Sequence, residues 1–344
     1  MARSTASQVP LQAIPSREFW LIETKGLRKS YPSRKRSQAA TVDAVRGIDL
    51  DVAAGEIFGF LGPNGAGKTT TLRMLATLIR PDGGEARIAG ADLLTDPGEV
   101  RRRIGYVAQG GGTTDAVSAR EELVLQARMY GIGKAEAGRL TEAALKAFDL
   151  TDFADRPCGT YSGGQRRRVD IALGVIHGPR VLFLDEPTVG LDPSSRSQVW
   201  DEIRRLRTEG MTVVVTTHYL DEADALCDRV SIVDHGEIVA EGTPAALKRE
   251  ISGDVVLVGL EPGESIADRA ADALRAEPYL HRLETRGADG EDGLRLYVED
   301  GAAAIPQLLR TLGEAGVVPG TVQLQRPSLD DVFLARTGRS LQQS

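Results

Sequence analysis

Short apolar runs recur along the part of the chain that precedes residue 250, and they have the length of strands. Residues 19–31, 41–52 and 102–109 predict strands. The run 55–62 ends in a glycine-rich loop, as a buried strand would. Residues 180–186 and 211–218 are apolar, rich in β-branched side chains and not alternating, which is typical of buried parallel strands.

Helical spacing of apolar side chains separates these runs. Leu72, Leu75, Ala76 and Ile79 share one helical face, and the turn sequence at 80–84 ends that helix. Residues 119–150 carry two further apolar faces and predict a helical insertion. Residues 195–210 form a helix between two predicted strands, as in a βαβ unit.

The pattern changes near residues 245–253, where a second domain begins. Beyond it we expect the order βαββαβ, a small ferredoxin-like layer. Its strands are predicted at 254–260, 280–286, 293–299 and 318–325, with helices at 265–276 and 302–315. A last helix starts at Ser328. Its Asp330, Asp331 and Phe333 either dock on the preceding domain or on a partner, or the helix stabilises a dimer.

Length and charge agree with two domains and an acidic protein. The chain has 344 residues, a net charge of −7 and pI ≈ 5.4, so a basic nucleic-acid surface is not expected. Residues 1–40 nevertheless hold eight Lys/Arg, including Arg34-Lys35-Arg36, which is either a solvated loop tip or a patch facing lipid or a partner. Two cysteines and no apolar run near 18 residues favour a reducing compartment and no membrane span.

Residues 62–69 match G-x-x-x-x-G-K-[ST] in full, between a predicted strand and a predicted helix. Glycines let backbone N–H groups surround phosphates; Lys68 would reach the β/γ-phosphates and Thr69 would place its hydroxyl on Mg²⁺. The nucleotide-binding residues expected here are Gly62, Pro63, Asn64, Gly65, Ala66, Gly67, Lys68, Thr69 and Thr70.

An acidic pair follows the apolar run that begins at Val181. Open α/β sheets build their sites at the carboxyl ends of strands, where Asp185 would hold Mg²⁺ and Glu186 would polarise the attacking water. Adjacent strand residues point to opposite faces, so two roles for two carboxylates are natural. The alternative is a solvated acidic pair at a strand end.

Three further side chains end strands or precede the phosphate loop. His218 would contact the γ-phosphate and orient Glu186 and water, although a lone His is usually structural. Gln109 would touch Mg²⁺ and water at the border with the helical insertion. Tyr31 would stack on adenine, or is simply packed.

A second turn with two glycines, Ser162-Gly163-Gly164-Gln165, leads into a predicted helix and could also bind an anion. Arg166, Arg167 and Arg168 lie in the first turn of that helix, where acids are normally favoured. We hypothesise that they meet a partner's anionic nucleotide or acidic surface; the alternative is ion pairs within the chain.

Together these motifs resemble the nucleotide-binding subunit of ATP-binding-cassette (ABC) proteins. "YSGGQ" is similar to the family's signature loop, with Tyr161 where Leu is usual; "YVAQ" resembles its Q-loop, "GLDP", with Asp192, its D-loop, and His218 its switch histidine. The motifs span residues 20–245 in the family's order.

The resemblance implies a head-to-tail pair of cassettes in which each ATP lies between one phosphate loop and the partner's signature loop. A C₂ homodimer would supply two such sites. Ser162 and the N–H of Gly164 would bind the γ-phosphate in trans, so that ATP binding closes the dimer and hydrolysis reopens it.

"THYLDEAD", "GTPAALK" and "PSLDDVFLARTGR" narrow the resemblance to the drug-export branch typified by daunorubicin-resistance ATP-binding subunits. It implies a separate six-helix ABC-2-type membrane permease that contacts the helical insertion, an amphiphilic drug or lipid as cargo, and a peripheral location on the cytoplasmic face of the plasma membrane. The insert after Tyr31 is longer than usual.

The sequence therefore predicts an α/β P-loop NTPase cassette with a mixed sheet and a ferredoxin-like α+β domain. The expected divisions are a flexible tail (1–18), the cassette (19–248, helical subdomain about 110–160) and an accessory domain (249–344). The function expected is that of an exporter ATPase using ATP and Mg²⁺. The alternatives are an importer ATPase and a soluble cassette ATPase acting on nucleic acid or ribosomes, although no nucleic-acid partner is expected.

Overall fold

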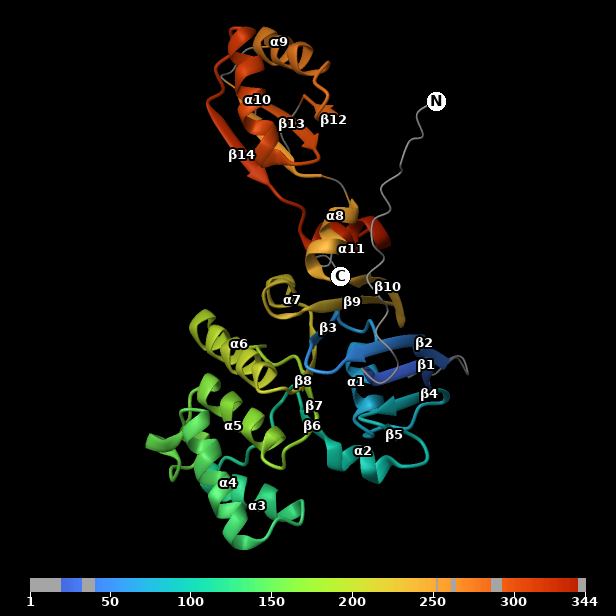
Figure 1. Cartoon of the computed structure of the whole chain (residues 1–344), viewed down its shortest axis with the longest axis vertical. Helices are drawn as coiled ribbons and strands as arrows, with labels where there is room; N and C mark the ends of the chain where they lie inside the picture. Colours follow the sequence, from blue (N-terminus) through green and yellow to red (C-terminus); the bar gives the residue numbers. More distant parts are fainter. Residues whose placement is uncertain (1–19, 33–40, 252, 261–263, 286–292, 340–344) are drawn as a thin grey trace, which may run out of the picture. The chain divides into compact units, whose positions relative to one another are not determined.

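The computed structural model describes residues 20–32, 41–251, 253–260, 264–285 and 293–339 (Figure 1). The chain is divided into two compact units. The first comprises residues 1–56 and 70–214, and the second comprises residues 57–69 and 215–344. Each unit is described by itself. The predicted tail at 1–18 and the segment Arg34-Lys35-Arg36 lie outside the described residues, and the boundary after residue 248 stays a prediction.

An antiparallel sheet in the order β2-β1-β4-β5 belongs to the first unit. Its strands β1 and β2 pair along most of their length, as the first two apolar runs predict. Its buried side chains include Ile22, Leu27, Val45 and Ile88. The four strands are β1 (Trp20–Pro32), β2 (Thr41–Ala53), β4 (Gly83–Ile88) and β5 (Ala91–Asp92).

The predicted strand at 102–109 is shorter than expected. It is β6 (Ile104–Val107), and residues 102 and 103 belong to a helix that the apolar pattern did not indicate, α2 (Pro97–Arg103). Proline at its N-terminus and ion pairs from Glu99 to Arg102 and Arg103 stabilise that helix. Strand β6 pairs in parallel with the wholly buried β7 (Val181–Asp185), as predicted for parallel strands.

Helices α3 and α4 form the predicted helical insertion, and Ser118 and Glu121 make a capping box at the start of α3. The remaining helices of this unit are α5 and α6, with two 3₁₀ turns before α5. The bounds are α3 (Ala119–Met129), α4 (Lys134–Ala147), η2 (Thr151–Phe153), η3 (Cys158–Thr160), α5 (Gly163–Val175) and α6 (Pro193–Thr208).

The helix after the phosphate loop, α1 (Lys68–Leu75), ends one turn earlier than its apolar spacing indicates. Thr77 adopts a left-handed conformation with φ 62°, and the Ile79 N–H donates to Arg73 O at 3.3 Å. A helix cannot continue through a left-handed residue, so Ile79 lies in the turn that follows.

The strands of a second, six-stranded sheet are divided between the two units. In the second unit, β3 pairs in parallel with β9, and β9 pairs antiparallel with β10. The bounds are β3 (Ile57–Leu61), β8 (Thr212–Thr217, with residues in both units), α7 (Leu220–Leu226), β9 (Arg229–Asp234), β10 (Glu237–Gly242) and α8 (Pro244–Ile251).

The C-terminal region has the predicted βαββαβ order, and its sheet is antiparallel with strand order β12-β13-β11-β14. Helices α9 and α10 pack on one face of this sheet over a core that includes Val256, Leu274, Leu296 and Leu308 (Figure 1). The bounds are β11 (Val255–Gly259), α9 (Glu264–Leu274), β12 (Leu280–Glu284), β13 (Gly293–Val298), α10 (Gly301–Glu314) and β14 (Thr321–Gln325).

The last helix, α11 (Leu329–Thr337), begins with Ser328 as N-cap, where the sequence predicted it. It packs against α8, and it also approaches α7 and β10. Arg336 forms an ion pair with Glu250 at 2.8 Å. Residues 329–339 therefore return to the region of the β9–β10 hairpin.

Candidate functional site

The loop between β3 and α1 has the backbone that an anion-binding loop needs. Gly65 and Gly67 have φ of 81° and 106°, values that side chains with a Cβ rarely adopt. Lys68 is buried, and its Nζ donates to Gly62 O at 2.6 Å and to Pro63 O at 2.9 Å. The ammonium group therefore lies inside the loop, among backbone groups that can surround a phosphate.

His218 follows β8, and the start of the phosphate loop contacts the end of that strand. The Gly62 N–H donates to Thr217 O at 3.4 Å, one residue before His218. The His218 ring is tilted against Tyr219, with 4.3 Å between centroids. The structure thus brings His218 and the first residue of the loop to one edge within the second unit.

In the first unit, the acidic pair lies at the end of β7 in two different environments. Asp185 is fully buried and its Oδ2 accepts from the Tyr106 hydroxyl at 3.4 Å. Glu186 lies beyond the strand in a left-handed conformation with φ 47°, and its Oε2 accepts from Gln109 Nε2 at 2.7 Å. The two carboxylates are therefore separated by a backbone bend rather than by strand alternation alone.

Tyr106 is a contact of this site that the sequence motifs did not indicate. Burial, and next the charge of Asp185, raise the pKa of the Tyr106 hydroxyl, so it stays protonated and able to donate. Its position three residues before Gln109, on a strand beside β7, is the only sequence signal for it.

Arg167 joins three backbone positions around the same carboxylates. This guanidinium is 6% exposed and donates to Pro187 O at 2.7 Å, Ala108 O at 2.8 Å and Asp185 O at 3.3 Å. It therefore ties the start of α5 to the residues on either side of Glu186 and to the residue before Gln109.

The neighbouring arginines also bind within the chain. Arg166 donates to Thr113 Oγ1 and O at 2.6 and 2.8 Å and pairs with Asp115 at 2.7 Å. Arg168 donates to Phe148 O at 3.1 Å. These contacts favour the alternative of intrachain bonding over the hypothesis that the three arginines face a partner's nucleotide.

Ser162 and Gln165 shape the second glycine-rich turn. Ser162 caps α5. Its Oγ accepts from the Gln165 backbone N–H at 3.2 Å, and the Gln165 side-chain Oε1 accepts from the Ser162 backbone N–H at 2.9 Å. Gly163 is exposed, whereas Gly164 is buried where a Cβ would lie 2.7 Å from Ser195 Oγ. The N-terminus of a 13-residue helix thus opens to solvent next to Ser162, a geometry that suits an anion.

Asp192 begins α6 as its N-cap. Its Oδ1 accepts from Ser195 N at 3.0 Å and its Oδ2 from Ser195 Oγ at 2.6 Å. The Ser195 hydroxyl, followed by the Ser195 backbone N–H, lowers the pKa of this carboxyl. Ser195 therefore lies between Asp192 and Gly164, which links the predicted D-loop to the predicted signature loop.

Tyr31 lies on β1 and is 38% exposed, with Lys29 Nζ 5.8 Å from the ring centroid. An exposed ring can stack on a base, and the adenine contact stays a prediction. Asn64 is exposed and Thr69 and Thr70 are half-buried in the phosphate loop and the start of α1.

The predicted metal ligands have the right chemistry for Mg²⁺. Thr69, Asp185 and Gln109 offer a hydroxyl, a carboxylate and an amide oxygen, and Mg²⁺ prefers a few such oxygens completed by water and phosphate. Within the described ranges, no group of three or more His, Cys, Asp or Glu is placed to hold a metal ion.

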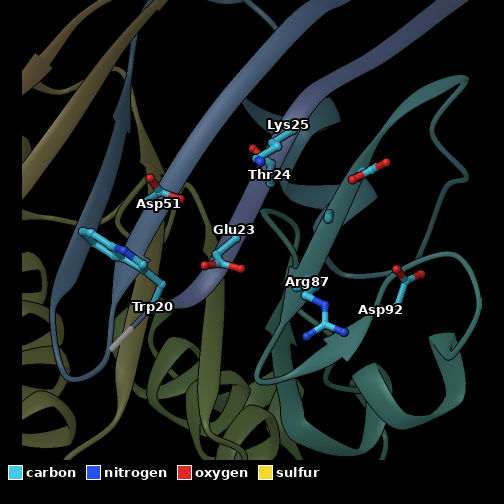
Figure 2. A pocket seen from close by; sticks show the side chains of 9 residues that line it. Trp20, Glu23, Thr24, Lys25, Asp51, Arg87 and Asp92 are labelled. Carbon is cyan, nitrogen blue, oxygen red and sulfur yellow. The ribbon is translucent and has the colours of Figure 1, made fainter. Parts of the chain in front are cut away.

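A cavity of about 290 Å³ lies on the antiparallel sheet of the first unit (Figure 2). Figure 2 shows Trp20, Glu23, Asp51 and Arg87 among the side chains that line it. None of the predicted site residues lines this cavity, so we do not assign it to the nucleotide site.

Comparison with known proteins supplies the family. The "ABC transporter" family model matches residues 45–189, and the model "ATP-binding protein DrrA1-3-like, C-terminal domain" matches residues 242–337. The chain is 44% identical over 325 residues to the daunorubicin/doxorubicin resistance ATP-binding protein DrrA of Streptomyces peucetius, covering 92% of each chain.

Two further similarities extend this result. The Nod factor export ATP-binding protein I of Burkholderia thailandensis is 38% identical over 87% of this chain and 93% of that protein. A dimeric post-hydrolysis structure of the ATP-binding cassette MJ0796 bound to ADP and Pi matches with TM-score 0.58 and 27% identity, covering 64% of this chain and 98% of that one.

The chain belongs to the ABC transporter ATP-binding proteins, in the group whose C-terminal domain is DrrA-like. The predicted fold class and the ATPase function are confirmed, and the protein is the ATP-hydrolysing subunit of an ABC exporter. No finding favours the importer or the nucleic-acid alternative.

Proposed function

We propose that the nucleotide lies on residues 62–70, with its phosphates around Lys68 and its base on Tyr31, and that Glu186 activates the attacking water. The Gln109 Nε2–Glu186 Oε2 hydrogen bond of 2.7 Å is the observation that carries this proposal. This hydrogen bond holds the Glu186 carboxylate, and the left-handed backbone of Glu186, with φ 47°, begins directly after Asp185 ends β7.

Phosphoryl transfer needs positioning and electrostatic stabilisation more than covalent chemistry. Mg²⁺ would supply charge neutralisation between the phosphates, with Thr69, Asp185 and Gln109 as its protein-side ligands or water contacts. Glu186 orients the water and accepts its proton, while His218 holds the γ-phosphate side of the site. Lys68 offsets phosphate charge from within its loop.

Gln109 connects the proposed catalytic carboxylate, Glu186, with the segment that leads into the helical insertion. It belongs to the segment that leads from β6 towards α3, and its amide also holds Glu186. A displacement of that segment by a membrane subunit would change the position of Gln109 and hence of the catalytic carboxylate. This is a direct physical route from transport to hydrolysis.

The second glycine-rich turn serves the nucleotide of another copy of the chain. Support comes from the exposed Ser162 and Gly163 at an α5 N-terminus that has no acidic residue in its first turn. The MJ0796 cassette, which resembles this chain in fold, is dimeric. In the proposed C₂ homodimer, Ser162, Gly163 and Gly164 bind γ-phosphate in trans, while Gln165 completes the capping box with Ser162 and Asp192 lies at the interface.

Helix α3 is the proposed docking surface for a six-helix ABC-2-type permease. Leu125 and Met129 are 56% and 74% exposed on this helix, and Tyr130 follows at 39%. Solvent-facing apolar side chains grouped on one helix are typical of a contact surface. No helix that the structure describes is both long and apolar enough to cross a lipid bilayer.

The proposed cargo is an amphiphilic drug or lipid, exported through that permease by a cassette bound peripherally at the cytoplasmic face of the plasma membrane. The similar proteins are named for resistance to daunorubicin and doxorubicin, for resistance to linearmycin and for export of Nod factor. In this proposal the membrane subunit, rather than the cassette, selects the cargo.

The test is a pull-down of tagged Glu186→Gln chain from its native membranes with Mg-ATP, followed by mass spectrometry. We expect a six-helix permease to be recovered, and less of it with the Lys68→Ala chain as the matched control. Recovery of ribosomes or nucleic acid without any membrane protein would contradict the proposed partner while leaving the ATPase chemistry intact.

A further inference from the structure

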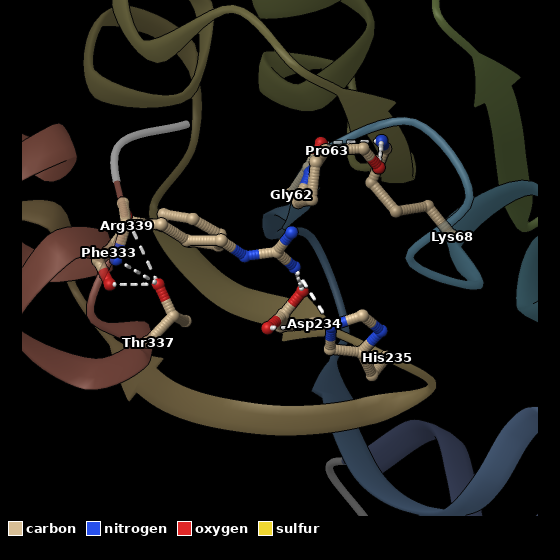
Figure 3. A network of polar contacts seen from close by, with 8 residues as sticks. All are labelled: Gly62, Pro63, Lys68, Asp234, His235, Phe333, Thr337 and Arg339. Carbon is tan, nitrogen blue, oxygen red and sulfur yellow. Dashed lines mark hydrogen bonds and ion pairs between the residues drawn. The ribbon is translucent and has the colours of Figure 1, made fainter. Parts of the chain in front are cut away.

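A polar network joins the end of α11 to the phosphate loop within the second unit (Figure 3). It begins where the helix terminates. Gly338 takes a left-handed conformation with φ 76°, and its N–H donates to Leu334 O at 2.8 Å. Thr337 Oγ1 lies 2.8 Å from Phe333 O and accepts from Arg339 N at 3.4 Å. The direction in which Arg339 leaves the helix is therefore set by the helix end itself.

The guanidinium of Arg339 binds the turn between β9 and β10. Its Nη2 lies 2.6 Å from Asp234 Oδ1 and 3.0 Å from His235 Nε2. The Asp234 side chain is only 10% exposed, so its charge has little water to stabilise it. Arg339, which lies 105 residues further along the chain, thus neutralises the nearly buried Asp234 carboxylate.

That turn is tight and has one favoured shape. Asp234 pairs with Glu237, which leaves His235 and Gly236 as a two-residue loop with φ of 47° and 83°. Positive φ at both positions is the geometry of a type I′ hairpin turn. A histidine in this region is strained, and contact with Arg339 helps to hold it there.

The same turn packs directly against the phosphate loop. The Gly236 N–H donates to Ala66 O at 2.9 Å. A Cβ on Gly62 would lie 2.2 Å from Val233 O, so the loop and the hairpin are in close backbone contact. Gly62 O in turn accepts from Lys68 Nζ (Figure 3).

We propose that Arg339 is a positioning residue for the nucleotide site: by fixing Asp234 and His235, it sets the hairpin against which residues 62–68 take their phosphate-binding shape. Nucleotide affinity then depends on the C-terminal segment, although Arg339 contacts no nucleotide. This inference rests on the proposed role of residues 62–70, and the reciprocal effect must also hold, so that bound nucleotide strengthens the Arg339–Asp234 contact.

The experiment compares full-length Arg339→Gln, Arg339→Lys and Arg336→Gln. Arg336 is the matched control because it lies on the same helix and its guanidinium pairs with Glu250 of α8 at 2.8 Å. Mg-ATP affinity is measured by titration calorimetry. We expect Arg339→Gln to weaken ATP binding about 5-fold, Arg339→Lys to recover part of the loss and Arg336→Gln to bind as the wild type does.

Two further variants separate the possible failures. Asp234→Asn combined with Arg339→Gln should weaken binding no more than the single changes, because both remove one interaction. Lys68→Ala tests the phosphate loop alone. If Lys68→Ala abolishes binding while Arg339→Gln and Arg336→Gln bind alike, the role of Arg339 is refuted; if Lys68→Ala binds ATP normally, the proposed site itself is wrong.

Discussion

Glu186 has a backbone conformation that a glutamate rarely adopts, with φ of 47°. Such a residue costs on the order of 1–3 kcal/mol and persists only where its surroundings over-determine it. Here Arg167 holds the carbonyls of Asp185 and Pro187 on either side, and Gln109 holds the side chain. The strain and the contacts that maintain it lie at the position proposed to be catalytic.

Replacing Arg167 should therefore affect hydrolysis more than nucleotide binding. For Arg167→Lys we expect kcat to fall about 10-fold, equivalent to roughly 1.4 kcal/mol, with ATP affinity within about 2-fold of wild type. The truncation Arg167→Ala should also lower the free energy of unfolding by about 3 kcal/mol, since three backbone carbonyls, two of them on buried residues, lose their donor.

Steady-state ATPase assays and chemical denaturation measure these effects. Arg166→Lys is the control, because Arg166 contacts Thr113 and Asp115 rather than the carboxylates at β7. Arg167→Lys with unchanged kcat would show that these carbonyl contacts do not position Glu186.

Glu186→Gln should bind ATP but hydrolyse it about 1,000-fold more slowly, because a general base contributes 10²–10⁴ in rate. Hydrolysis would no longer reopen the dimer, so ATP should trap it closed. Single-turnover hydrolysis and size-exclusion chromatography with Mg-ATP measure the two effects. A variant with wild-type turnover would overturn the assignment of Glu186 as base.

At the scale of the elements, the apolar runs predicted β1, β2, β3, β7 and β8. Strands β3, β7 and β8 are buried at every position, and a fully buried strand appears in the sequence as an apolar run. The sequence also located Gln109 and Glu186 at strand ends. It could not show that their side chains meet, since 77 residues separate them. Arginines in a first turn, where acids are normally favoured, suggested either a partner's anionic surface or ion pairs within the chain. The backbone carbonyls that accept from Arg167 have no sequence pattern that could decide between the two.

Helix α3 carries the element-scale prediction. Met129→Glu, or Leu125→Glu, should abolish recovery of the permease while leaving ATP affinity and thermal stability near wild type, because both side chains already face solvent. Leu94→Glu is the control, since Leu94 is also exposed, at 40%, but follows β5. Equal permease recovery from Met129→Glu and Leu94→Glu chains would place the docking surface elsewhere.

At the scale of the whole molecule, the sequence predicts one phosphate loop and one glycine-rich signature turn in each chain. The predicted βαββαβ order of the C-terminal region is the order that the structure has. The sequence did not indicate that Arg339 returns to the β9–β10 hairpin, because an ion pair across 105 residues depends on how the helix end is directed. The remaining question at this scale is which chain's signature turn serves which nucleotide.

Dimers that combine two different variants test whether Ser162 serves the nucleotide of its own chain or of the other chain. In a head-to-tail dimer of Lys68→Ala with Ser162→Ala, one site combines both defects and the other combines an intact Lys68 with an intact Ser162. If each chain instead used its own Ser162, both sites would be defective.

We expect co-expressed, differently tagged chains, purified through both tags, to hydrolyse ATP faster than either parent homodimer and at no more than about half the wild-type rate. Activity equal to that of the parents would contradict binding in trans, and an additional Ser162→Ala change on the Lys68→Ala chain should remove any activity gained, because it destroys the one intact site.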